Sequence, residues 1–355
     1  MLFDLPDPDT LYAALLARDS RFDGHAFVCV SSTGIFCRLT CPARKPKREH
    51  CNFYPTIGEC VQAGFRPCKR CHPLQAAALA DPAIASLLGA LDQRPDVRWS
   101  EEHVIKLGHD PSTVRRSFKR QFGMTFLELA RQRRLREGFK TLAGGGKVIT
   151  AQHEASFESA SAFRAAFARL LGRPPAKLRS DALRSETSLW ATWIPTPLGD
   201  MIAVSSRSHL HLLEFIDRKG LPRELERLQE ASKGVIGIGG TPPSEQAASE
   251  LGEYFAARSD IFLTPLAAPA SPFTQKVWDA LRTIPAGETR SYSDIANQIG
   301  HPAATRAVAR ANGANQIALM IPCHRVIGAD GSLTGYGGGL WRKQRLLEIE
   351  RQLNK

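Results

Sequence analysis

Residues 315–339 read NQIALMIPCHRVIGADGSLTGYGGG. In this segment an apolar run ends in Pro322, Cys323, His324 and Arg325. Proline fixes its own φ and biases the preceding residue towards an extended backbone, so the chain should leave the core here at a defined angle. A thiol with an ordinary pKa of about 8.5 is a weak nucleophile at neutral pH, and an adjacent base or cation activates it. The alternative is a buried structural cysteine beside a surface histidine, and the pair alone favours that alternative.

The chain has 355 residues, of which 43% are hydrophobic and 23% are charged, as is typical of soluble globular proteins. This length is enough for about two to four domains. No apolar run is long enough to span a bilayer, and the acidic, proline-broken start MLFDLPDPDT is typical of neither a signal peptide nor a transit peptide. We therefore expect a cytoplasmic protein with reduced thiols and no membrane partner.

The net charge of +12 is unevenly distributed along the chain. Residues 1–80 contribute +3, residues 81–186 contribute +7 and residues 187–355 contribute +2. A basic middle third indicates a polyanionic partner such as DNA. Because a basic surface can also serve solubility, the charge supports DNA binding without proving it.

Seven of the eight cysteines lie within residues 29–71. Two short-spaced pairs, Cys37-x3-Cys41 and Cys68-x2-Cys71, are separated by 26 residues. In a reduced compartment this spacing indicates metal rather than disulfides, and four thiolates can hold one tetrahedral Zn²⁺. Of the remaining cysteines, we expect Cys29 to lie in a core strand. We expect Cys51 and Cys60 to be incidental.

The sequence around these cysteines, residues 32–71, resembles the N-terminal domain of the Ada family of response proteins. In that family the four matching cysteines bind zinc, and the first, here Cys37, also accepts a methyl group from a methylated DNA phosphate. Zinc keeps its ligand thiols deprotonated, and a methyl phosphotriester is an uncharged electrophile. Basic residues crowd around the cysteines and could hold the flanking phosphates, or simply form a solvated surface. They are Arg38, Arg44, Lys45, Lys47, Arg48, Arg66, Lys69 and Arg70, and we expect DNA contacts above all from Arg44, Lys45 and Arg66.

Residues 82–184 contain two predicted helix-turn-helix units. In the first unit Asp110 is a good N-cap, Pro111 suits the first helical position, and Gly123 ends the helix. The second unit begins near Val148 and ends at Gly172. Either unit could also belong to an ordinary helix bundle.

The paired units resemble the AraC-type DNA-binding domain, whose two recognition helices enter successive major grooves. Here these helices are Pro111–Gln121 and Ser159–Ala168. Two positions depart from the family pattern, because His109 replaces an apolar residue and Ser156 replaces a frequent glycine. The expected DNA contacts are Arg115, Arg116, Lys119 and Arg120 in the first helix and Arg164 in the second.

Residues 187–355 are predicted to contain an antiparallel sheet followed by helices. Alternating apolar and polar residues with turn signals fill the start of this region. Residues 231–245 read as a weakly structured connection, and a helix is expected over Glu245–Ala257. Further helices, a third helix-turn-helix spacing near Cys323 and a long terminal helix complete the chain.

This region resembles the DNA O6-alkylguanine alkyltransferases, whose fold pairs a small ribonuclease-H-like α/β domain with a winged-helix-like catalytic domain. The resemblance implies that Cys323 is the alkyl acceptor. It implies that His324 and Glu350 form a relay that removes the thiol proton through a water, and that Asn315 is the hinge that braces the site.

The same resemblance assigns residues that handle the DNA. Tyr292 stands beside the base and phosphate and helps to rotate the nucleotide and protonate the leaving atom. Arg306 fills the gap left by the flipped base. Tyr336 lines the pocket, Gly337 falls where some relatives have serine, and Arg325 is placed among the DNA-binding residues.

The sequence therefore predicts a multidomain α+β protein. Its expected parts are a small zinc-binding α/β domain (1–80), an all-α double helix-turn-helix domain (82–184), the ribonuclease-H-like domain (187–268) and the winged-helix-like alkyltransferase domain (270–355). The expected function is DNA repair by irreversible transfer of methyl groups from O6-methylguanine, and O4-methylthymine, to Cys323, and from methylphosphotriesters to Cys37.

The resemblances also imply regulation and partners. Methylation of Cys37 is expected to switch on sequence-specific DNA binding and transcription activation in the adaptive response to alkylation. No methyl-donor cofactor is expected, because the damaged DNA is the donor. We expect double-stranded DNA and RNA polymerase as partners, and a monomer in the bacterial cytoplasm, associated with the nucleoid.

Three alternatives remain open from the sequence. One is an alkyltransferase without regulatory activity. Another is a DNA-binding regulator whose C-terminal thiol is silent, against which the joint presence of Tyr292, Arg306 and Glu350 argues. The third is a cysteine hydrolase that uses Cys323 and His324, although nothing in the sequence indicates an oxyanion hole.

Overall fold

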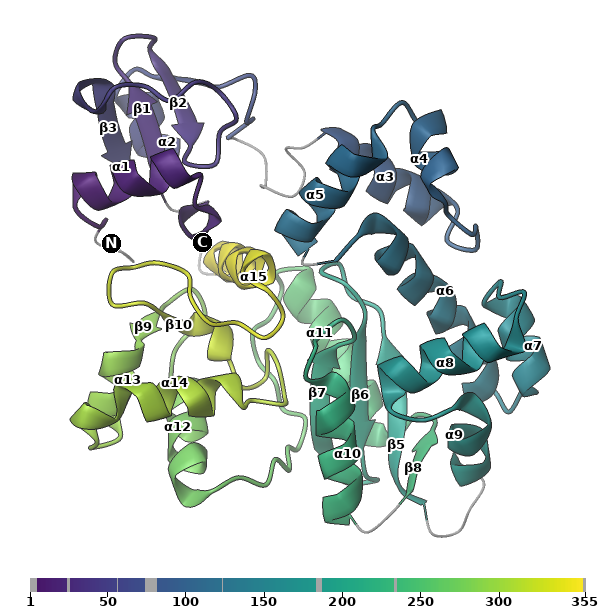
Figure 1. Ribbon diagram of the computed structural model, residues 1–355. Helices are drawn as coiled ribbons and strands as arrows, with labels where there is room; N and C mark the ends of the chain where they lie inside the picture. Colours follow the sequence, from purple (N-terminus) through teal and green to yellow (C-terminus); the bar gives the residue numbers. More distant parts are fainter. Residues whose placement is uncertain are drawn as a thin grey trace.

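The computed structural model describes residues 5–23, 26–55, 57–73, 82–122, 124–182, 187–232 and 235–353. The chain order runs from purple at the N-terminus to yellow at the C-terminus (Figure 1). Among the helices so described, none combines the length and the apolar character needed to cross a bilayer.

The N-terminal region is a small sheet between two helices. Its elements are α1 (Pro8–Ala17), β1 (Phe27–Val30), β2 (Ile35–Arg38), β3 (Cys51–Tyr54), α2 (Ile57–Gln62) and β4 (Arg66–Pro67), with strand order β3-β1-β2-β4. Strand β1 alternates, so Val28 packs on the α1 side with the zinc-site cysteines while Phe27 and Cys29 pack on the α2 side with Cys60. The expectation of a core strand at Cys29 is confirmed.

All the regular secondary structure of the middle region, among the described residues, is helical. It comprises α3 (Pro82–Gln93), α4 (Glu101–Lys106), α5 (Pro111–Phe122), α6 (Phe126–Ala143), α7 (Val148–Glu154), α8 (Ala160–Leu171) and α9 (Pro175–Ala182). Asp110 caps α5 as predicted, since its Oδ2 accepts a hydrogen bond from the Thr113 N–H at 2.7 Å. Gly123 lies outside the described residues.

Ser156, where the AraC-type pattern has a frequent glycine, adopts a left-handed backbone with φ 51°. Glycine is the residue that reaches this conformation at least cost, which explains the family preference. The Ser156 carbonyl accepts a hydrogen bond of 2.8 Å from Arg134 Nη1, so a long-range contact holds the turn between α7 and α8.

The third region contains the larger sheet. Its elements are β5 (Thr187–Ile194), β6 (Met201–Ser205), β7 (Leu210–Phe215), α10 (Leu221–Ser232), β8 (Val235–Ile238) and α11 (Pro242–Phe255). The strand order is β7-β6-β5-β8. The antiparallel pairing of β5, β6 and β7 is confirmed, but β8 pairs parallel to β5. The expectation of a weakly structured connection over residues 231–245 is therefore wrong for the part that forms β8.

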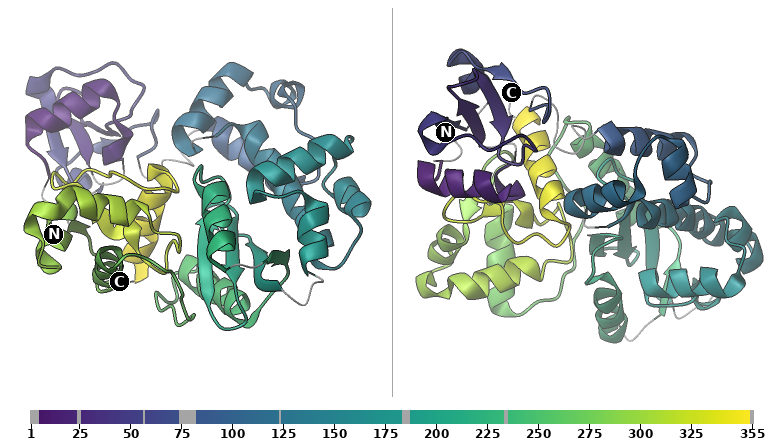
Figure 2. Two further views of the ribbon diagram at one scale, coloured as in Figure 1. Left: turned by 60° about the horizontal axis from the view of Figure 1, so that its bottom comes forward. Right: turned by 45° about the horizontal axis from the view of Figure 1, so that its top comes forward.

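Both faces of this sheet are covered. One face, including Met201 and Ala203, packs on α11 and the C-terminal helices. The opposite face, including Ile202 and Val204, packs on α10 and also on α6, α7, α8 and α9 of the middle region. Figure 2 shows from two further directions that these middle helices lie against the sheet. The helix-turn-helix region and the sheet thus share one hydrophobic core across the expected boundary near residue 185.

The last region surrounds the Cys323 segment. Its elements are α12 (Pro272–Arg282), β9 (Arg290–Ser291), α13 (Tyr292–Gln298), α14 (Thr305–Gly313), β10 (Val326–Ile327) and α15 (Leu340–Leu353). Trp278 of α12 donates a hydrogen bond of 2.9 Å to the Ala311 carbonyl of α14, which fixes the angle between these helices. Strands β9 and β10 pair in parallel, so the start of α13 lies beside the residues that follow Cys323.

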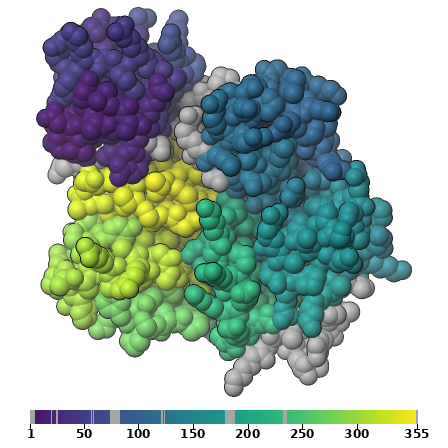
Figure 3. Space-filling view, in the orientation of Figure 1, coloured from purple at the N-terminus to yellow at the C-terminus, as the bar shows by residue number. Residues whose placement is uncertain are grey.

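Side-chain contacts also join the regions at other points. The ring of Phe122, at the end of α5, meets Trp341 of α15 edge-on with centroids 4.9 Å apart. Arg136 of α6 forms an ion pair of 3.2 Å with Asp200, in the turn before β6. The Leu333 N–H donates to the Arg21 carbonyl at 3.3 Å, and Figure 3 shows the purple N-terminal region against the yellow C-terminal segment.

Candidate functional sites

Cys323 lies in a 3-10 turn, Cys323–Arg325, within a buried run that extends from Ile317 to Ile327. The thiol is 6% exposed. Asn315 donates from Nδ2 to the Cys323 Sγ at 3.2 Å and to the Ile321 carbonyl at 2.8 Å, so one amide group fixes both the turn and the sulfur. Burial raises the pKa of Cys323 to about 11, and the Asn315 hydrogen bond opposes that shift. The thiol is therefore protonated at neutral pH and needs a base to become nucleophilic.

His324 and Glu350 form a buried pair next to this thiol. His324 Nε2 lies 2.8 Å from Glu350 Oε1, and neither side chain has exposed area. Burial lowers the pKa of His324, and the Glu350 carboxylate opposes that change, so the imidazole is neutral at pH 7. With Nε2 donating to the carboxylate, Nδ1 carries the lone pair. Within the described structure this buried Nδ1 has no hydrogen-bond partner and is available to accept a proton.

Arg325 does not lie where the sequence placed it. Its side chain is buried, donates from Nε and Nη2 to the Glu350 carboxylate and from Nη1 to the Ile284 carbonyl. Glu350 also accepts hydrogen bonds from Tyr254 Oη at 2.9 Å and the Gly287 N–H at 3.1 Å. The assignment of Arg325 to DNA binding is therefore wrong, because its guanidinium is committed to holding the carboxylate of the relay.

The residues expected to handle the nucleotide surround the same turn. Tyr292 begins α13 and is half-buried, and a Cβ added at Gly335 would lie 2.8 Å from its hydroxyl. Tyr336 is also partly buried, with its ring centroid 6.4 Å from that of His324. Arg306 is exposed in the first turn of α14. The structure thus brings two tyrosines and the relay together and leaves Arg306 exposed at a helix start.

Sequence reasoning missed several buried charged groups beside this site. Lys343 of α15 is fully buried, donates to the Val326 and Thr334 carbonyls, and has its pKa lowered by burial to about 8. Glu214 lies near the end of β7 and Arg218 lies just after that strand, in a different part of the chain. No local signal distinguishes such residues from solvated ones, because it is the fold that buries them.

The four cysteines of the predicted zinc site come together. The sulfurs of Cys37, Cys41, Cys68 and Cys71 all lie within 4.8 Å of one another. Four sulfurs at about 2.3 Å from a tetrahedral zinc lie roughly 3.8 Å apart, so the cluster fits the ion. Backbone N–H groups of Arg38 and Arg70 approach Cys71 and Cys68 at 3.5 and 3.4 Å, which favours thiolate sulfurs.

A cavity of about 570 Å³ opens beside this cluster and includes Cys37, Cys41 and Cys68 in its lining. Arg44, Arg66, Lys69 and Arg70 are exposed on its wall. Lys45 lines it too, although its Nζ already donates to the Leu39 and Cys41 carbonyls at 3.4 and 3.5 Å. The cavity therefore presents sulfur and positive charge together.

Other basic residues of this region have structural partners. Arg38 is buried and donates to the Cys71 and His72 carbonyls. Arg48 forms an ion pair of 2.8 Å with Asp9. Arg38 therefore does not form part of a solvated surface, because its guanidinium is buried and committed to backbone carbonyls.

The helix-turn-helix side chains are mostly exposed. Arg115, Arg116 and Lys119 lie on the outer face of α5, although Arg115 is paired with Glu101. Arg164 is exposed on α8, while Phe163 and Phe167 face the shared core. The side chain of Arg120 lies outside the described residues.

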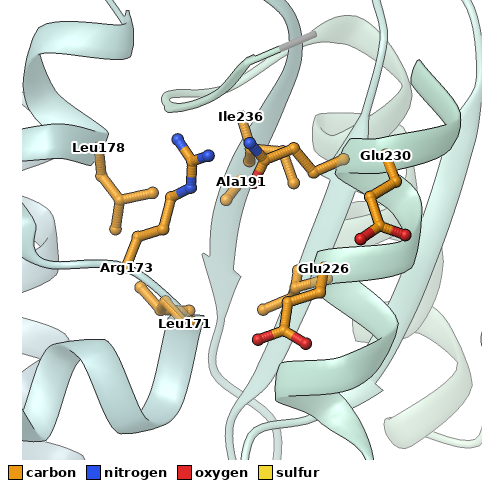
Figure 4. A pocket seen from close by; sticks show the side chains of 10 residues that line it. Leu171, Arg173, Leu178, Ala191, Glu226, Glu230 and Ile236 are labelled. Atoms are coloured by element: carbon orange, nitrogen blue, oxygen red, sulfur yellow. The ribbon is translucent and has the colours of Figure 1, made fainter. Parts of the chain in front are cut away.

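A further cavity, of about 530 Å³, lies where α8 and α9 meet the sheet and α10. Figure 4 shows Arg173 on one side of it and Glu226 and Glu230 of α10 on the other. Leu171, Leu178 and Ile236 give it an apolar floor. It marks a loosely filled part of the junction between the middle helices and the sheet.

Known families match three separate parts of the chain. The family described as Metal binding domain of Ada matches residues 10–73. The family described as Helix-turn-helix domain matches residues 105–181. The family described as 6-O-methylguanine DNA methyltransferase, DNA binding domain matches residues 272–352.

Curated relatives match both the whole chain and its C-terminal part. The bifunctional transcriptional activator/DNA repair enzyme Ada of Escherichia coli K12 is 36% identical over 353 residues, which cover 97% of this chain and 96% of that protein. The regulatory protein ada of Salmonella typhimurium LT2 is 33% identical, with 97% of each chain covered. The methylated-DNA–protein-cysteine methyltransferase of Mycobacterium leprae is 45% identical over 156 residues, which cover 44% of this chain and 88% of that relative.

Proposed function

Because this chain belongs to the Ada family of bifunctional transcriptional activators and DNA repair enzymes, we propose that it removes methyl groups from DNA at two of its own cysteines. Its enzyme activity is that of a methylated-DNA–protein-cysteine methyltransferase, and its N-terminal four-cysteine cluster holds a zinc ion. The observation that carries the proposal is the buried Cys323 thiol, hydrogen-bonded by Asn315 and adjacent to the His324–Glu350 pair.

At Cys323 the reaction is a displacement at carbon. His324 accepts the thiol proton at Nδ1 through a bridging water, and the Glu350 carboxylate stabilises the imidazolium that forms. The sulfur attacks the methyl carbon of O6-methylguanine or O4-methylthymine, a carbon–sulfur bond forms, and the carbon–oxygen bond breaks with its electron pair going to the base. Tyr292 gives the base a proton. The product thioether has no easy reverse reaction, so each molecule acts once.

Tyr336 and Arg306 handle the nucleotide in this proposal. Extrusion of the base costs a few kcal/mol of stacking, and an inserted side chain offsets part of it. The exposure of Arg306 at the start of α14 supports this role.

At the other site, Cys37 accepts the methyl group of a methylphosphotriester. When bound, zinc keeps the cysteine sulfurs as thiolates at neutral pH. Cys37 lines the basic cavity, so a phosphate held by Arg44 and Arg66 would bring its methyl group to that sulfur. Methylation of Cys37 then strengthens binding to a specific promoter through α5 and α8, and the protein activates transcription in contact with RNA polymerase.

Finer features of the family complete the proposal. The parts are an Ada-type zinc domain (1–80), an AraC-type domain (82–184), a ribonuclease-H-like domain (187–268) and a winged-helix-like catalytic domain (270–355). The protein acts as a monomer on double-stranded DNA in the cytoplasm, at the nucleoid.

The experiment that tests the proposal is mass spectrometry of the protein after reaction with two DNA duplexes. One duplex carries a single O6-methylguanine and the other a single methylphosphotriester. We expect 14 Da, one CH₂ unit by mass, on Cys323 from the first and on Cys37 from the second, by about one equivalent each. Cys323→Ala should lose only the first reaction and Cys37→Ala only the second. Substantial transfer from O6-methylguanine to the Cys323→Ala protein would disprove the assignment.

A further inference from the structure

Arg218 reaches the Cys323 site from the sheet region. It follows β7, and its side chain is 12% exposed. Its Nη1 donates to the Asn315 carbonyl at 2.9 Å, and its Nη2 donates to the Gly313 carbonyl at 3.0 Å. Both acceptors lie almost a hundred residues further along the chain. Asn315 is the residue whose amide holds the Cys323 sulfur. The Arg218 guanidinium, from the sheet region, therefore binds the backbone around Asn315, the hinge residue of the Cys323 region.

The same guanidinium lies against the loop that follows the site. A Cβ added at Gly337 would lie 3.0 Å from Arg218 Cζ, so the guanidinium occupies the space that a side chain at Gly337 would need. This loop carries Tyr336, and Gly313 ends α14, which carries Arg306. Arg218 thus contacts the end of α14, the hinge and the pocket loop at once.

The edge of β7 continues this connection. The Leu213 N–H donates to the Gln316 carbonyl at 2.8 Å, and the Ala318 N–H donates to the Leu213 carbonyl at 2.8 Å. Gln316 Nε2 also donates to the His211 carbonyl at 3.2 Å. The chain that leads to Cys323 is therefore hydrogen-bonded to β7 along residues 316–318, and Arg218 extends this pairing to the hinge and the end of α14.

Two acidic side chains keep Arg218 in place. Glu214, which is fully buried, binds Nη1, and Glu224 of α10 lies 2.9 Å from Nη2. The two carboxylates and the two backbone carbonyls define one position for the planar guanidinium, which binds several acceptors in fixed directions. A residue needed only to neutralise Glu214 would not require the two carbonyls beside Cys323.

We propose that Arg218 is a positioning residue for methyl transfer from O6-alkylguanine, which acts by fixing Asn315 and, through it, the Cys323 sulfur. The inference rests on the proposed function of Cys323. Asn315 can stabilise the sulfur only if its amide stays within hydrogen-bond reach as the sulfur gains negative charge. Arg218 binds the Asn315 carbonyl while the Asn315 amide binds the sulfur, so that geometry is set before DNA binds.

The charges of this group affect the thiol in opposite directions. Burial raises the pKa of Cys323, Glu214 raises it further, and Arg218 lowers it. Removing Arg218 alone leaves a buried carboxylate without its partner, which also threatens stability. When Glu214 and Arg218 are both replaced, their opposite effects on the pKa of Cys323 largely cancel. What remains is the loss of the hydrogen bonds to the Asn315 and Gly313 carbonyls. The double change therefore separates geometry from charge.

The test measures single-turnover methyl transfer to Cys323 from a duplex with one O6-methylguanine, at saturating DNA and across pH. The variants are Arg218→Met, the double variant Glu214→Gln with Arg218→Met, and Arg218→Lys. Arg223→Met, at an exposed position on α10, is the matched control for loss of one positive charge. Transfer to Cys37 from a methylphosphotriester and thermal unfolding report on the rest of the molecule.

We expect the double variant to slow transfer to Cys323 at saturation by about 10- to 100-fold, the usual cost of a small misplacement at a reacting centre. Transfer to Cys37 should be unchanged. For Arg218→Met alone, the rise of the transfer rate with pH should occur at higher pH than in the unchanged protein, because Arg218 lowers the pKa of Cys323. In the double variant this rise should return towards its original pH, while the transfer rate stays low. Arg218→Lys should be intermediate, because one ammonium cannot bind both carbonyls and Glu214 as a planar fork does.

A wild-type rate in the double variant would overturn the proposal and leave Arg218 as the counter-ion of Glu214. Equal losses in Arg223→Met would overturn it too, since surface charge would then explain the effect. If the double variant does not fold, Arg218→Lys decides, and a wild-type rate in that variant counts against positioning. Absence of transfer to Cys323 in the unchanged protein would instead refute the proposed function.

Discussion

At the scale of single residues, the Cys323 site separates the group that reacts from the group that takes its proton. The thiol has its pKa raised by burial to about 11, whereas His324 is a buried neutral imidazole whose Nδ1 has no hydrogen-bond partner among the described residues. A raised thiol pKa means that the nucleophilic form is scarce at pH 7 and becomes common only as the pH rises towards that value. The base therefore matters most at neutral pH.

Replacing His324 by glutamine should expose this dependence. We expect transfer to Cys323 at pH 7 to fall by about 10²- to 10⁴-fold, the usual contribution of a positioned base. The remaining rate should climb about tenfold per pH unit up to the thiol pKa, because hydroxide then removes the proton. A stopped-flow or quench measurement from pH 6 to pH 10 gives the profile, with transfer to Cys37 as the internal control. A flat profile in the variant would show that His324 is not the base.

Arg325 shows where reading single residues from sequence reaches its limit. Its neighbours in the sequence identify the reactive segment, and the resemblance to the alkyltransferases assigned roles to Cys323, His324 and Asn315. Arginine is usually exposed, so a contact with DNA was the natural expectation. Only the fold shows that α15 brings Glu350 to this guanidinium, because the partner lies 25 residues away.

At the scale of elements, α14 presents Arg306 at its exposed start and is anchored at its far end. Trp278 and Arg218 bind the Ala311 and Gly313 carbonyls near its C-terminus. A helix held in this way can push one side chain into a base stack without moving away. Its exposed N-terminal turn is therefore the part that meets the duplex in the proposed mechanism.

Changing Arg306 to alanine should slow repair of duplex DNA more than repair of the free O6-methylguanine base. An inserted side chain contributes only when a stack must be opened, at a cost of about a few kcal/mol. The two rates can be compared directly by measuring labelled methyl groups on Cys323. Arg310→Ala, on the same helix and also exposed, is the matched control and should affect the two substrates equally. Equal losses for Arg306→Ala would reduce that residue to a surface charge.

The elements were predicted from sequence to the extent that local signals mark them. Asp110 and Pro111 start α5 as expected, and the turn residues between β5 and β6 mark that hairpin. By contrast, α10 was not foreseen and β8 was read as a loose connection. Strand β8 reads VIGI, in which valine and isoleucine favour a strand, but the run has only four residues and contains a glycine. It forms a strand by pairing in parallel with β5, where Thr187 pairs with Val235 and Ala191 with Ile238. Pairing at that distance leaves no trace in a short window of sequence.

At the scale of the whole molecule, the zinc site and the promoter-reading helices lie in different regions but face the same polyanion in the proposed function. Four thiolates on Zn²⁺ carry a formal charge of about −2, and methylation of one sulfur changes it to about −1. With an effective dielectric near 20, one charge about 6 Å from a phosphate changes the energy by roughly 3 kcal/mol before salt screening. About 1.4 kcal/mol is enough for a tenfold change in affinity.

Methylation of Cys37 should therefore tighten promoter binding by at least about tenfold at low salt, with the gain shrinking as salt rises. Fluorescence anisotropy of a labelled promoter duplex, before and after reaction with a methylphosphotriester, measures the change. Protein methylated only at Cys323 serves as the control and should bind as the unmodified protein does. An unchanged affinity at low salt, where the effect should be greatest, would exclude relief of repulsion as the switch.

The core that α6, α7, α8 and α9 share with the larger sheet limits how this protein can be taken apart. Ile202, Val204 and Leu212 face those helices, while Phe139, Phe163 and Phe167 face the sheet. After cleavage by a protease near residue 185, the two fragments would remain associated through this shared hydrophobic core. A gene that lost its first half would encode a sheet with hydrophobic side chains exposed on its outer surface. A lineage that discards the regulator while keeping the repair enzyme must therefore also rewrite the side chains on that surface, which makes the loss of one activity a matter of many coordinated substitutions.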